Sequence, residues 1–464
     1  MASKSKRARM APVRNLNKTF LYWALVVFVV KLLIIFNIQG GNIEISGRPF
    51  FVDGIWIGAD GENYLAGYEA LNREGVFSKV EILNYWPAGY PLVILLMSLL
   101  GKSWALTTLA LFQSAIFSLS VYLFTTQLAQ TRLKKFSYLV FALIILNPTL
   151  TLSSIAIGYE SLTASGFLIV VAVILRDLID KNEKKFLKYL IVNSIVLGLL
   201  AFMQPRLIIA GVLIMISWIL VRKGLKASSV FIIVSLLVTL FFPATLIYRN
   251  HKAVGLNAIS TNLGITMNIG AGDNANGGYM TEGYGVPCSL TGSKTTQDNQ
   301  RVKCVINWYL DNPVKAFELF YKKTIYFWSP WINNGFAGDV YTGTMLRNPW
   351  LKISPITNIA SNEDGANLVY GSIGKLFSWL WLLSGLALMF YGFWVLWRQK
   401  SMERFLALLA LATITSNWLI SLISIGDHRF RIPIMGLSLF LQAVGLKTIF
   451  KAGKPPMVDG PSLR

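Results

Sequence analysis

Apolar runs close to 20 residues long recur along the whole of this 464-residue chain. The first extends from Phe20 to Phe36, and others follow it at short intervals. A segment of this length spans the hydrocarbon core of a bilayer as one helix. Hydrophobic residues make up 54% of the chain and charged residues 14%, which is too apolar for a water-soluble protein of this size. The sequence therefore predicts an all-α polytopic membrane protein, whose first run is a span and not a cleavable signal peptide.

The net charge of +21 comes from basic residues that cluster between the apolar runs. The clusters lie at Lys4 to Lys18, Arg132 to Lys135, Lys181 to Lys188, Arg222 to Lys226, Arg398 to Arg404 and in the tail 451–464. Short loops rich in Lys and Arg stay in the cytoplasm, and they also attract anionic lipids. The excess charge is therefore attributed to membrane orientation and lipid contact, and no nucleic-acid partner is expected.

About ten transmembrane helices, with both termini in the cytoplasm, place all of these clusters on the inner side. The predicted spans are 19–37, 103–129, 136–152, 155–176, 187–203, 206–221, 227–248, 373–397, 404–424 and 434–450. The apolar piece from Gly89 to Gly101 is short for a crossing, and counting it would move every later basic cluster to the outside. We therefore predict a re-entrant or interfacial helix there, on the outer face.

The domain organisation follows from this topology. A transmembrane domain, residues 1–450, precedes the basic cytoplasmic tail 451–464. It includes a first outer loop with surface helices at 38–102 and a large outer region at 249–372, which is rich in Gly, Asn and Thr. A third outer turn follows at 426–431. Because the inner side offers only short basic turns, binding or catalysis is expected on the outer side.

Three acidic residues are candidates for chemistry at this outer face. Asp60 precedes a helix that carries Tyr64 and Tyr68 on one face, and that helix is expected to lie on the membrane surface with its tyrosines toward lipid. A carboxylate at this point can act as a general base for an incoming hydroxyl, or it can only cap the helix, which stabilises by about 1 kcal/mol. Asp53 lies in an extended stretch and alone is typical of a turn. Glu160, in the turn before a span, either belongs to a functional site or reaches interface water.

Several cations are predicted on the outer side, against the usual bias. They are Arg206, Arg249, His428, Arg429 and Arg431. Guanidinium groups match phosphate oxygens, so these residues are candidates for an anion site. Two alternatives stay open: Arg206 snorkels to lipid headgroups, and the 428–431 cations form a structural ion pair with Asp427.

The large outer region contains a run rich in Gly and Asn that includes Asn262 and Asn268. Such a composition indicates tight turns and close backbone approach to a ligand, or only a flexible loop. Cys288 and Cys304, the two cysteines of the chain, lie in the same region, where a disulfide would suit an oxidising compartment. Two cysteines and two histidines without ligand spacing predict no zinc site. The sequence contains no phosphate-binding loop, so ATP is not expected as a cofactor.

Four stretches of the chain, taken in order, are similar to the motifs of a known enzyme class. They are Asp60 to Tyr64 with Pro87 to Pro91 (which includes Tyr90), Met203 to Arg206, Arg249-Asn250 with 260–270 and 277–279, and Gly426 to Pro433. In order and placement they resemble the GT-C class of polyprenyl-phosphate-sugar-dependent glycosyltransferases, akin to protein O-mannosyltransferases and lipid A aminoarabinose transferases. The order Pro205-Arg206 and the presence of His251 depart from that pattern, which affects substrate detail more than class.

The resemblance implies a GT-C-like fold and an inverting sugar transfer from a polyprenyl-phosphate donor to the hydroxyl of a lipid, glycan or protein acceptor. The reaction would occur on the outer face of a bacterial cytoplasmic membrane. Asp60 would be the base, with Glu160 and Asp53 as further acids. The expected substrate-binding or lipid-phosphate-binding residues are Arg206, Arg249, His428, Arg429, Arg431, Tyr64, Tyr90, Asn262 and Asn268. The reaction does not require a divalent metal, although participation of a metal stays open. Two rival functions remain: an O-antigen ligase or polymerase-type transferase with a lipid-diphosphate donor, and a transporter or flippase of lipid-linked sugars.

Overall fold

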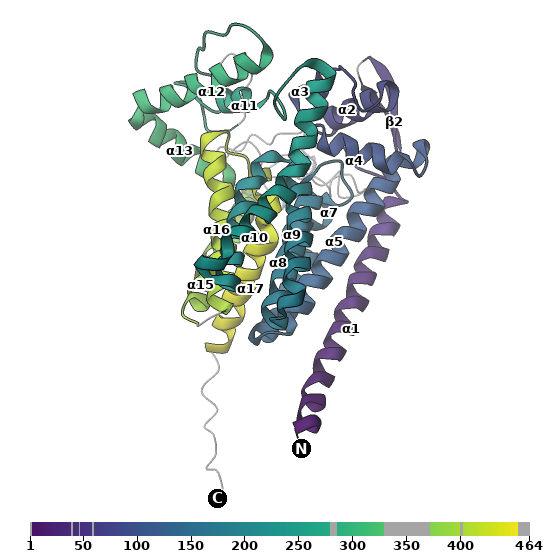
Figure 1. Ribbon diagram of the computed structural model, residues 1–464, viewed down its shortest axis with the longest axis vertical. Coiled ribbons are helices and arrows are strands. Elements are labelled where there is room, and N and C mark those ends of the chain that lie inside the picture. The colour runs from purple at the N-terminus through teal and green to yellow at the C-terminus, as the bar shows by residue number, and fades with distance from the viewer. Residues whose placement is uncertain are drawn as a thin grey trace, which may run out of the picture.

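The computed structural model is a helical bundle with irregular segments and short helices gathered at one end (Figure 1). It describes residues 2–38, 40–45, 47–57, 60–278, 285–328, 372–399 and 402–452. The second part of the large outer region, 329–371, and the tail from residue 453 onward lie outside the described residues. The end of the bundle that carries α2, α11, α12 and α13 is named the loop-rich end, and the end at which α1 begins and α17 finishes is named the terminal end.

Eight helical segments among the described residues are long and apolar enough to cross a membrane. They belong to α1 (Ala2–Ile35), α5 (Ala105–Ala129), α8 (Glu160–Asp180), α9 (Glu183–Met203), α10 (Ile208–Val254), α15 (Ser372–Trp397), α16 (Met402–Ile423) and α17 (Met435–Ala452). Their lengths match the thickness of a hydrocarbon core at 1.5 Å per residue. The prediction of an all-α polytopic membrane protein is therefore confirmed.

The longest helix, α10, consists of two helical segments. Gly224 lies inside it with φ 72° and ψ 171°, a conformation that breaks a helix and that glycine adopts without steric cost. Gly211 from the first segment contacts Leu197 of α9, and Gly198 of α9 contacts Thr239 from the second segment. Because both segments pack against the same part of α9, α10 folds back at Gly224. The two spans predicted at 206–221 and 227–248 correspond to these segments.

The predicted span 136–152 corresponds to two short helices, α6 (Ser137–Leu146) and α7 (Pro148–Ser153). Pro148 begins α7, and the Asn147 side chain accepts a hydrogen bond from the Leu150 amide, which explains the interruption. Neither helix is long enough alone to be a span, so the total of ten crossings stays a prediction. The helix α8 begins at Glu160 and not at 155, because residues 155–157 pair with the first loop instead.

The first loop contains a small hairpin that the sequence did not predict. Strands β1 (Gly41–Ile45) and β2 (Arg48–Val52) pair antiparallel, with Ile45 opposite Arg48. After the hairpin come α2 (Gly61–Glu74), α3 (Ile82–Tyr85) and α4 (Gly89–Ser98). The ten-residue α4 packs between α2 and α5 at the loop-rich end (Figure 1). It is too short to span a bilayer alone, as predicted.

The apolar face of α2 is buried in protein. Tyr64 and Tyr68 are 4% and 3% exposed. The Tyr64 ring packs edge-on against Tyr90, with 5.0 Å between centroids, and Tyr68 packs edge-on against Phe50 of the hairpin. The expectation that these tyrosines face lipid is wrong, because the same periodicity serves for packing on protein.

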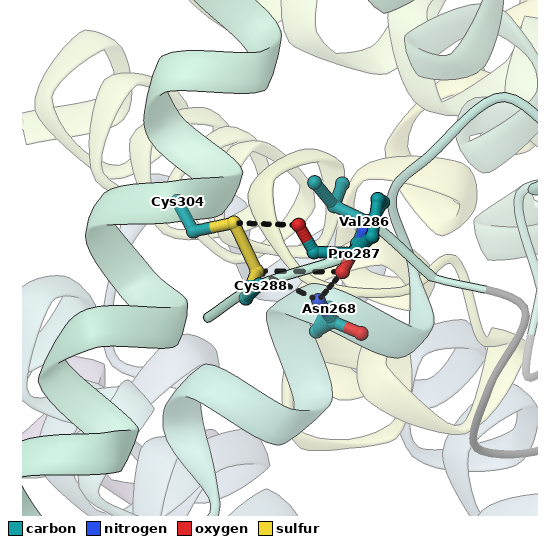
Figure 2. Close-up of a disulfide and its surroundings, with 5 residues drawn as sticks. All are labelled: Asn268, Val286, Pro287, Cys288 and Cys304. Carbon is teal, nitrogen blue, oxygen red and sulfur yellow. Dashed lines mark hydrogen bonds between the residues drawn. A yellow bond between two sulfur atoms is a disulfide. The ribbon is translucent and has the colours of Figure 1, made fainter. Parts of the chain in front are cut away.

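The large outer region folds into α11 (Leu263–Ile269), α12 (Lys294–Asp311) and α13 (Pro313–Trp328). Cys288 and Cys304 form a disulfide that joins the segment before α12 to the middle of that helix (Figure 2). Asn268 of α11 donates hydrogen bonds to the Val286 carbonyl and to the Cys288 sulfur. The disulfide and Asn268 therefore hold α11 and α12 together.

Candidate active site

The two acids named from the sequence, Asp60 and Glu160, are brought together by backbone pairing. The Trp56 amide donates to the Ile155 carbonyl at 3.0 Å, and the Ile157 amide donates to the Trp56 carbonyl at 2.8 Å. This bridge ties the first loop to the segment before α8. Asp60 then precedes α2 and Glu160 begins α8, so both carboxylates lie at helix starts on the loop-rich end.

Arg429 lies between these acids. Its Nη1 is 2.7 Å from Asp60 Oδ2, and its Nε is 3.8 Å from Glu160 Oε1 and 3.8 Å from Asp427 Oδ2. Arg429 is 9% exposed and Glu160 is 2% exposed. One buried guanidinium thus faces three carboxyl groups, an arrangement in which charge interactions are strong because little water screens them.

The side chain of Asp60 does not cap its helix. Asp60 occupies the N-cap position of α2, but it makes no capping hydrogen bond. Its carboxylate accepts a hydrogen bond from Arg429, 369 residues away in the sequence. Of the two roles that the sequence left open for Asp60, the geometry favours participation in a polar site.

Asp427 is the acid that orders the last turn. It accepts hydrogen bonds from the Arg429 amide at 2.8 Å, and its Oδ1 lies 3.1 Å from His428 Nδ1. Burial works against ionisation of this carboxyl, but His428 and Arg429 outweigh burial and hold the pKa of Asp427 below its ordinary value. Asp427 therefore stays ionised and fixes the backbone that carries Arg429. The ion pair between Asp427 and the 428–431 cations, which the sequence left open, is therefore present. Arg429 also pairs with Asp60 and Glu160.

Arg206 contributes a second guanidinium. Its Nη2 donates to the Tyr159 hydroxyl at 3.2 Å, and its guanidinium carbon lies 3.5 Å above the centre of the Phe430 ring. Stacking on an aromatic face stabilises a cation and fixes its plane. Arg206 is thus held inside the protein, next to residues adjoining Glu160 and Arg429, and does not extend to lipid headgroups.

Three buried tyrosines, Tyr64, Tyr90 and Tyr159, pack together next to Asp60 and Glu160. Tyr64 contacts Tyr90 and also Tyr159, with 6.2 Å between the centroids of the latter pair. Burial raises the pKa of Tyr64 and of Tyr159, and the neighbouring acids Asp60 and Glu160 raise both further. These hydroxyls therefore remain protonated and able to donate hydrogen bonds.

Tyr90 positions the segment that precedes Glu160. Its hydroxyl accepts a hydrogen bond from the Gly158 amide at 2.8 Å and donates to Gln113 Oε1 at 2.9 Å. Gln113 in turn donates to the Ala156 carbonyl. Burial raises the pKa of Tyr90, so this network stays intact at high pH. Tyr90 therefore supports the segment that carries Glu160. Because its side chain is fully buried, it is not placed to contact a large substrate directly.

Several buried polar atoms of the cluster have no hydrogen-bond partner within the described protein. They are Glu160 Oε2, Arg206 Nε and Arg429 Nε. Leaving a buried polar group unpaired costs about 1–3 kcal/mol, and more for a charged group. Both acceptors and donors are therefore available to one polar ligand. We name the set Asp60, Glu160, Arg206, Asp427 and Arg429 the acid–arginine cluster.

Arg249 lies in a different environment. Its Nε donates to the Val76 carbonyl at 2.9 Å, its Nη1 donates to the Leu83 carbonyl at 3.1 Å, and its Nη2 donates to the Ser78 carbonyl. Nη1 also donates to the side chains of Asn84 and Asn250. The guanidinium thus attaches α10 to the first loop.

The remaining sequence candidates lie outside the acid–arginine cluster. Asp53 is exposed, just after β2, and among the described residues no ion pair joins it to the cluster. Asn262 accepts from Ser260, and Asn268 supports the disulfide segment. Arg431 Nη1 donates to the Trp328 carbonyl at 2.9 Å, which ties the last turn to the end of α13.

Sequence reasoning missed Tyr159 and Phe430, the two aromatic residues that hold Arg206. The sequence could have indicated both, because Tyr159 is next to the candidate Glu160 and Phe430 lies between the candidates Arg429 and Arg431. Within the described residues, no group of three or more His, Cys, Asp and Glu side chains is arranged to hold a metal ion.

Comparison with known proteins identifies no relative. No family model, no curated protein and no solved structure matches the chain.

Proposed function

We propose that this membrane protein transfers a sugar, with inversion, from a polyprenyl-phosphate donor to an acceptor hydroxyl at the acid–arginine cluster. The observation that supports this most is the Asp60 carboxylate held 2.7 Å from Arg429 in a buried site with a second guanidinium, Arg206. Such a site offers a base for a hydroxyl and cations for a phosphate leaving group. The motif resemblance to GT-C glycosyltransferases supports the same reaction.

In the proposed reaction, Asp60 accepts the proton of the acceptor hydroxyl. The acceptor oxygen forms a bond to the anomeric carbon as the bond from that carbon to the phosphate oxygen breaks. The electron pair of the broken bond remains on the lipid phosphate, whose added negative charge Arg429 and Arg206 stabilise. Attack opposite to the leaving group inverts the configuration, and Glu160 Oε2 accepts a hydrogen bond from a sugar hydroxyl.

The Asp60–Arg429 pair has a defined role in this scheme. The hydrogen bond from Arg429 occupies Asp60 Oδ2, and it must be released before that oxygen can accept a proton from the acceptor hydroxyl. A donor phosphate competes for Arg429 and draws it away from Asp60, so the base becomes active when the donor is bound. Asp427 keeps the Arg429 backbone in place during this exchange.

The proposed orientation places the loop-rich end outside a bacterial cytoplasmic membrane. The Cys288–Cys304 disulfide lies at this end, and disulfides persist in oxidising compartments. The basic clusters around Arg132 and Lys181 follow the last residues of α5 and α8, at the terminal end of the bundle. The positive-inside rule places such clusters on the cytoplasmic side. The reaction would then use donors in the outer leaflet.

A transfer assay tests the proposal. Purified protein in liposomes receives a radiolabelled polyprenyl-phosphate sugar and membrane acceptors, and labelled product is followed for wild type and Asp60→Asn. We expect the variant to lose about 10³-fold in rate, the usual contribution of a general base. Glu62→Gln is the matched control, because Glu62 is an exposed acid on the same helix.

Other outcomes separate the alternatives. An unchanged rate for Asp60→Asn would refute the base assignment, and a loss confined to Asp53→Asn would transfer that role to Asp53. Transfer from a lipid-diphosphate sugar but not from the monophosphate would establish the ligase-type reaction. Movement of labelled donor between leaflets without product would establish a flippase.

A further inference from the structure

A cavity lies at the terminal end, far along the bundle from the acid–arginine cluster. Its volume is about 750 Å³, and it opens between η2 (Arg132–Phe136), the end of α8, the break in α10 and the beginning of α16. Its apolar lining consists of Leu178, Val221, Met402 and Phe405. Its charged lining consists of Arg132, Lys181, Arg222 and Glu403. Three cations and one acid thus share a wall with apolar side chains.

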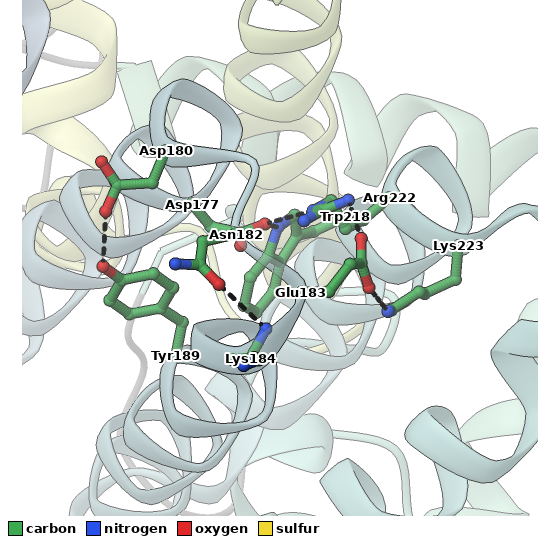
Figure 3. Close-up of polar contacts among 9 residues, drawn as sticks. All are labelled: Asp177, Asp180, Asn182, Glu183, Lys184, Tyr189, Trp218, Arg222 and Lys223. Carbon is green, nitrogen blue, oxygen red and sulfur yellow. Dashed lines mark hydrogen bonds and ion pairs between the residues drawn. The ribbon is translucent and has the colours of Figure 1, made fainter.

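Arg222 lines this cavity and has one guanidinium nitrogen without a hydrogen-bond partner within the described protein. Figure 3 shows its guanidinium between Asp177 and Glu183, which accept from Nε and Nη1. The Trp218 indole also donates to Asp177, at 3.1 Å, and this fixes the carboxylate. The third nitrogen, Arg222 Nη2, is buried and has no hydrogen-bond partner within the described protein. The guanidinium is therefore held rigidly while one of its N–H groups stays available.

Glu403 presents the opposite charge. It is 6% exposed, and no hydrogen bond or ion pair reaches its side chain from any residue that the structure describes. Glu403 lines the cavity, so its carboxylate is open to a ligand there and is not engaged by a protein partner among the described residues. Glu403 therefore favours a ligand that brings a hydrogen-bonding cation.

The four charged residues lie at the ends of membrane-spanning segments. Arg132 follows α5, Lys181 follows α8, Glu403 is the second residue of α16, and Arg222 lies just before the break at Gly224. The ends of spanning helices meet the lipid headgroups, and the apolar residues beside them meet the start of the acyl chains. A cavity at these helix ends therefore lies at the depth of the lipid headgroups in the leaflet at the terminal end.

We propose that this cavity binds one phospholipid with a primary ammonium headgroup, of the phosphatidylethanolamine type. Its phosphate accepts hydrogen bonds from Arg222 Nη2 and attracts Lys181 and Arg132. Its ammonium group donates to the Glu403 carboxylate. The first carbons of its acyl chains contact Leu178, Val221, Met402 and Phe405.

The charge pattern discriminates against other lipids. A phosphatidylglycerol headgroup supplies the phosphate but no cation for Glu403. A phosphatidylcholine headgroup supplies a cation whose three methyl groups prevent it from donating a hydrogen bond. Only a primary ammonium satisfies the carboxylate and the guanidinium together.

Native mass spectrometry of the purified full-length protein tests this proposal. Protein in detergent is titrated separately with ethanolamine, choline and glycerol phospholipids that carry identical acyl chains. We expect tighter binding of the ethanolamine lipid by about tenfold, which is the size of one charge-assisted hydrogen bond. Glu403→Gln should remove that preference, and Lys181→Asn should weaken all three lipids, since asparagine tolerates the left-handed backbone of Lys181.

The control variant is Lys185→Gln, which removes an exposed cation from the same turn outside the cavity lining, and it should bind all three lipids as wild type does. Equal binding of the three lipids by wild type would overturn the proposal, whatever the variants do. So would a preference that survives in Glu403→Gln. Displacement of the lipid by free phosphoethanolamine at equal concentration would overturn the assignment to a membrane lipid.

Discussion

Two buried arginines at the loop-rich end, Arg249 and Arg429, are bonded in contrasting ways. Every nitrogen of the Arg249 guanidinium donates to an uncharged oxygen, mostly a backbone carbonyl of residues 76–84. Arg429 instead faces carboxyl groups, and its Nε has no hydrogen-bond partner within the described protein. The sequence predicted a phosphate-binding role for both arginines. Their different partners indicate that Arg249 stabilises the fold, whereas Arg429 is the one proposed to exchange a carboxylate for a phosphate.

The difference has a physical basis. Backbone carbonyls cannot move away from Arg249 without unfolding the first loop, so a phosphate that bound there would leave buried carbonyls unpaired. The carboxylate of Asp60 can release Arg429 to a phosphate, because one anion replaces another. The following predictions test this contrast, from the largest expected effect to the smallest.

Arg429→Lys should reduce sugar transfer most. Lysine keeps the charge but cannot bind Asp60 and a phosphate with a planar fork. We expect about 10³-fold slower transfer in the liposome assay, as when one preorganised donor is lost from a catalytic site. The unfolding free energy should change little compared with that loss. A rate within a factor of a few of wild type would remove Arg429 from the proposed mechanism.

Arg249→Lys should show the opposite pattern. The ammonium cannot reproduce the contacts that three guanidinium nitrogens make to the first loop. We expect about 3 kcal/mol lower stability, at about 1 kcal/mol per lost hydrogen bond, measured by equilibrium unfolding in mixed micelles. Transfer per folded molecule should stay at the wild-type level. If transfer falls while stability is unchanged, Arg249 belongs to the site and the contrast fails.

Acid should destabilise the Arg429 region but not the Arg249 region. The folded-state pKa of Asp427 lies below its ordinary value, so its contribution to stability is present above about pH 4 and is lost as the pH falls through the folded-state pKa. Wild type should therefore lose about 2 kcal/mol more than Asp427→Asn between about pH 5 and pH 2. Arg249→Lys should retain the wild-type pH slope, because the acceptors of Arg249 do not titrate. Equal slopes for wild type and Asp427→Asn would contradict the ion-pair assignment.

Tyr90→Phe should have the smallest effect. It removes one hydroxyl that holds Gly158 and Gln113 behind Glu160. We expect a loss of about 1 kcal/mol in unfolding free energy and about a threefold slower transfer through misplacement of Glu160. The paired variant Tyr68→Phe should be closer to wild type, since Tyr68 is also a buried tyrosine but its ring packs against Phe50 of the hairpin. A larger effect from Tyr68→Phe would refute the positioning role of Tyr90.

Hydrophobic length predicted most of the spanning helices, because apolar runs and bilayer thickness largely determine them, but it did not predict the interruption of 136–152 at Pro148. It also predicted the break that folds α10 back at Gly224, through the basic cluster between the two runs. It could not predict the β1–β2 hairpin or the direction of Tyr64, because these depend on contacts between distant segments. The pairing of Trp56 with residues 155–157 is another such contact.

The sequence identified most residues of the site, but it did not predict the role of each residue equally well. Asp60, Glu160, Arg206 and Arg429 were all identified from their type and their predicted side of the membrane. The separation of Arg249 from them was not, because sequence gives no account of which oxygens a buried guanidinium meets. The carboxylate of Glu403 was not recognised either, since an acid near a helix start is ordinary in sequence.

Binding of polyprenyl monophosphate, the proposed leaving group, tests the central claim most directly. Purified folded wild type, Arg429→Lys and Arg249→Lys are titrated in detergent with this lipid, so that no acceptor or sugar needs to be known. We predict that Arg429→Lys binds about tenfold more weakly, as expected for loss of a bidentate phosphate contact, while Arg249→Lys binds as wild type does. Weaker binding by Arg249→Lys together with unchanged binding by Arg429→Lys would contradict the account.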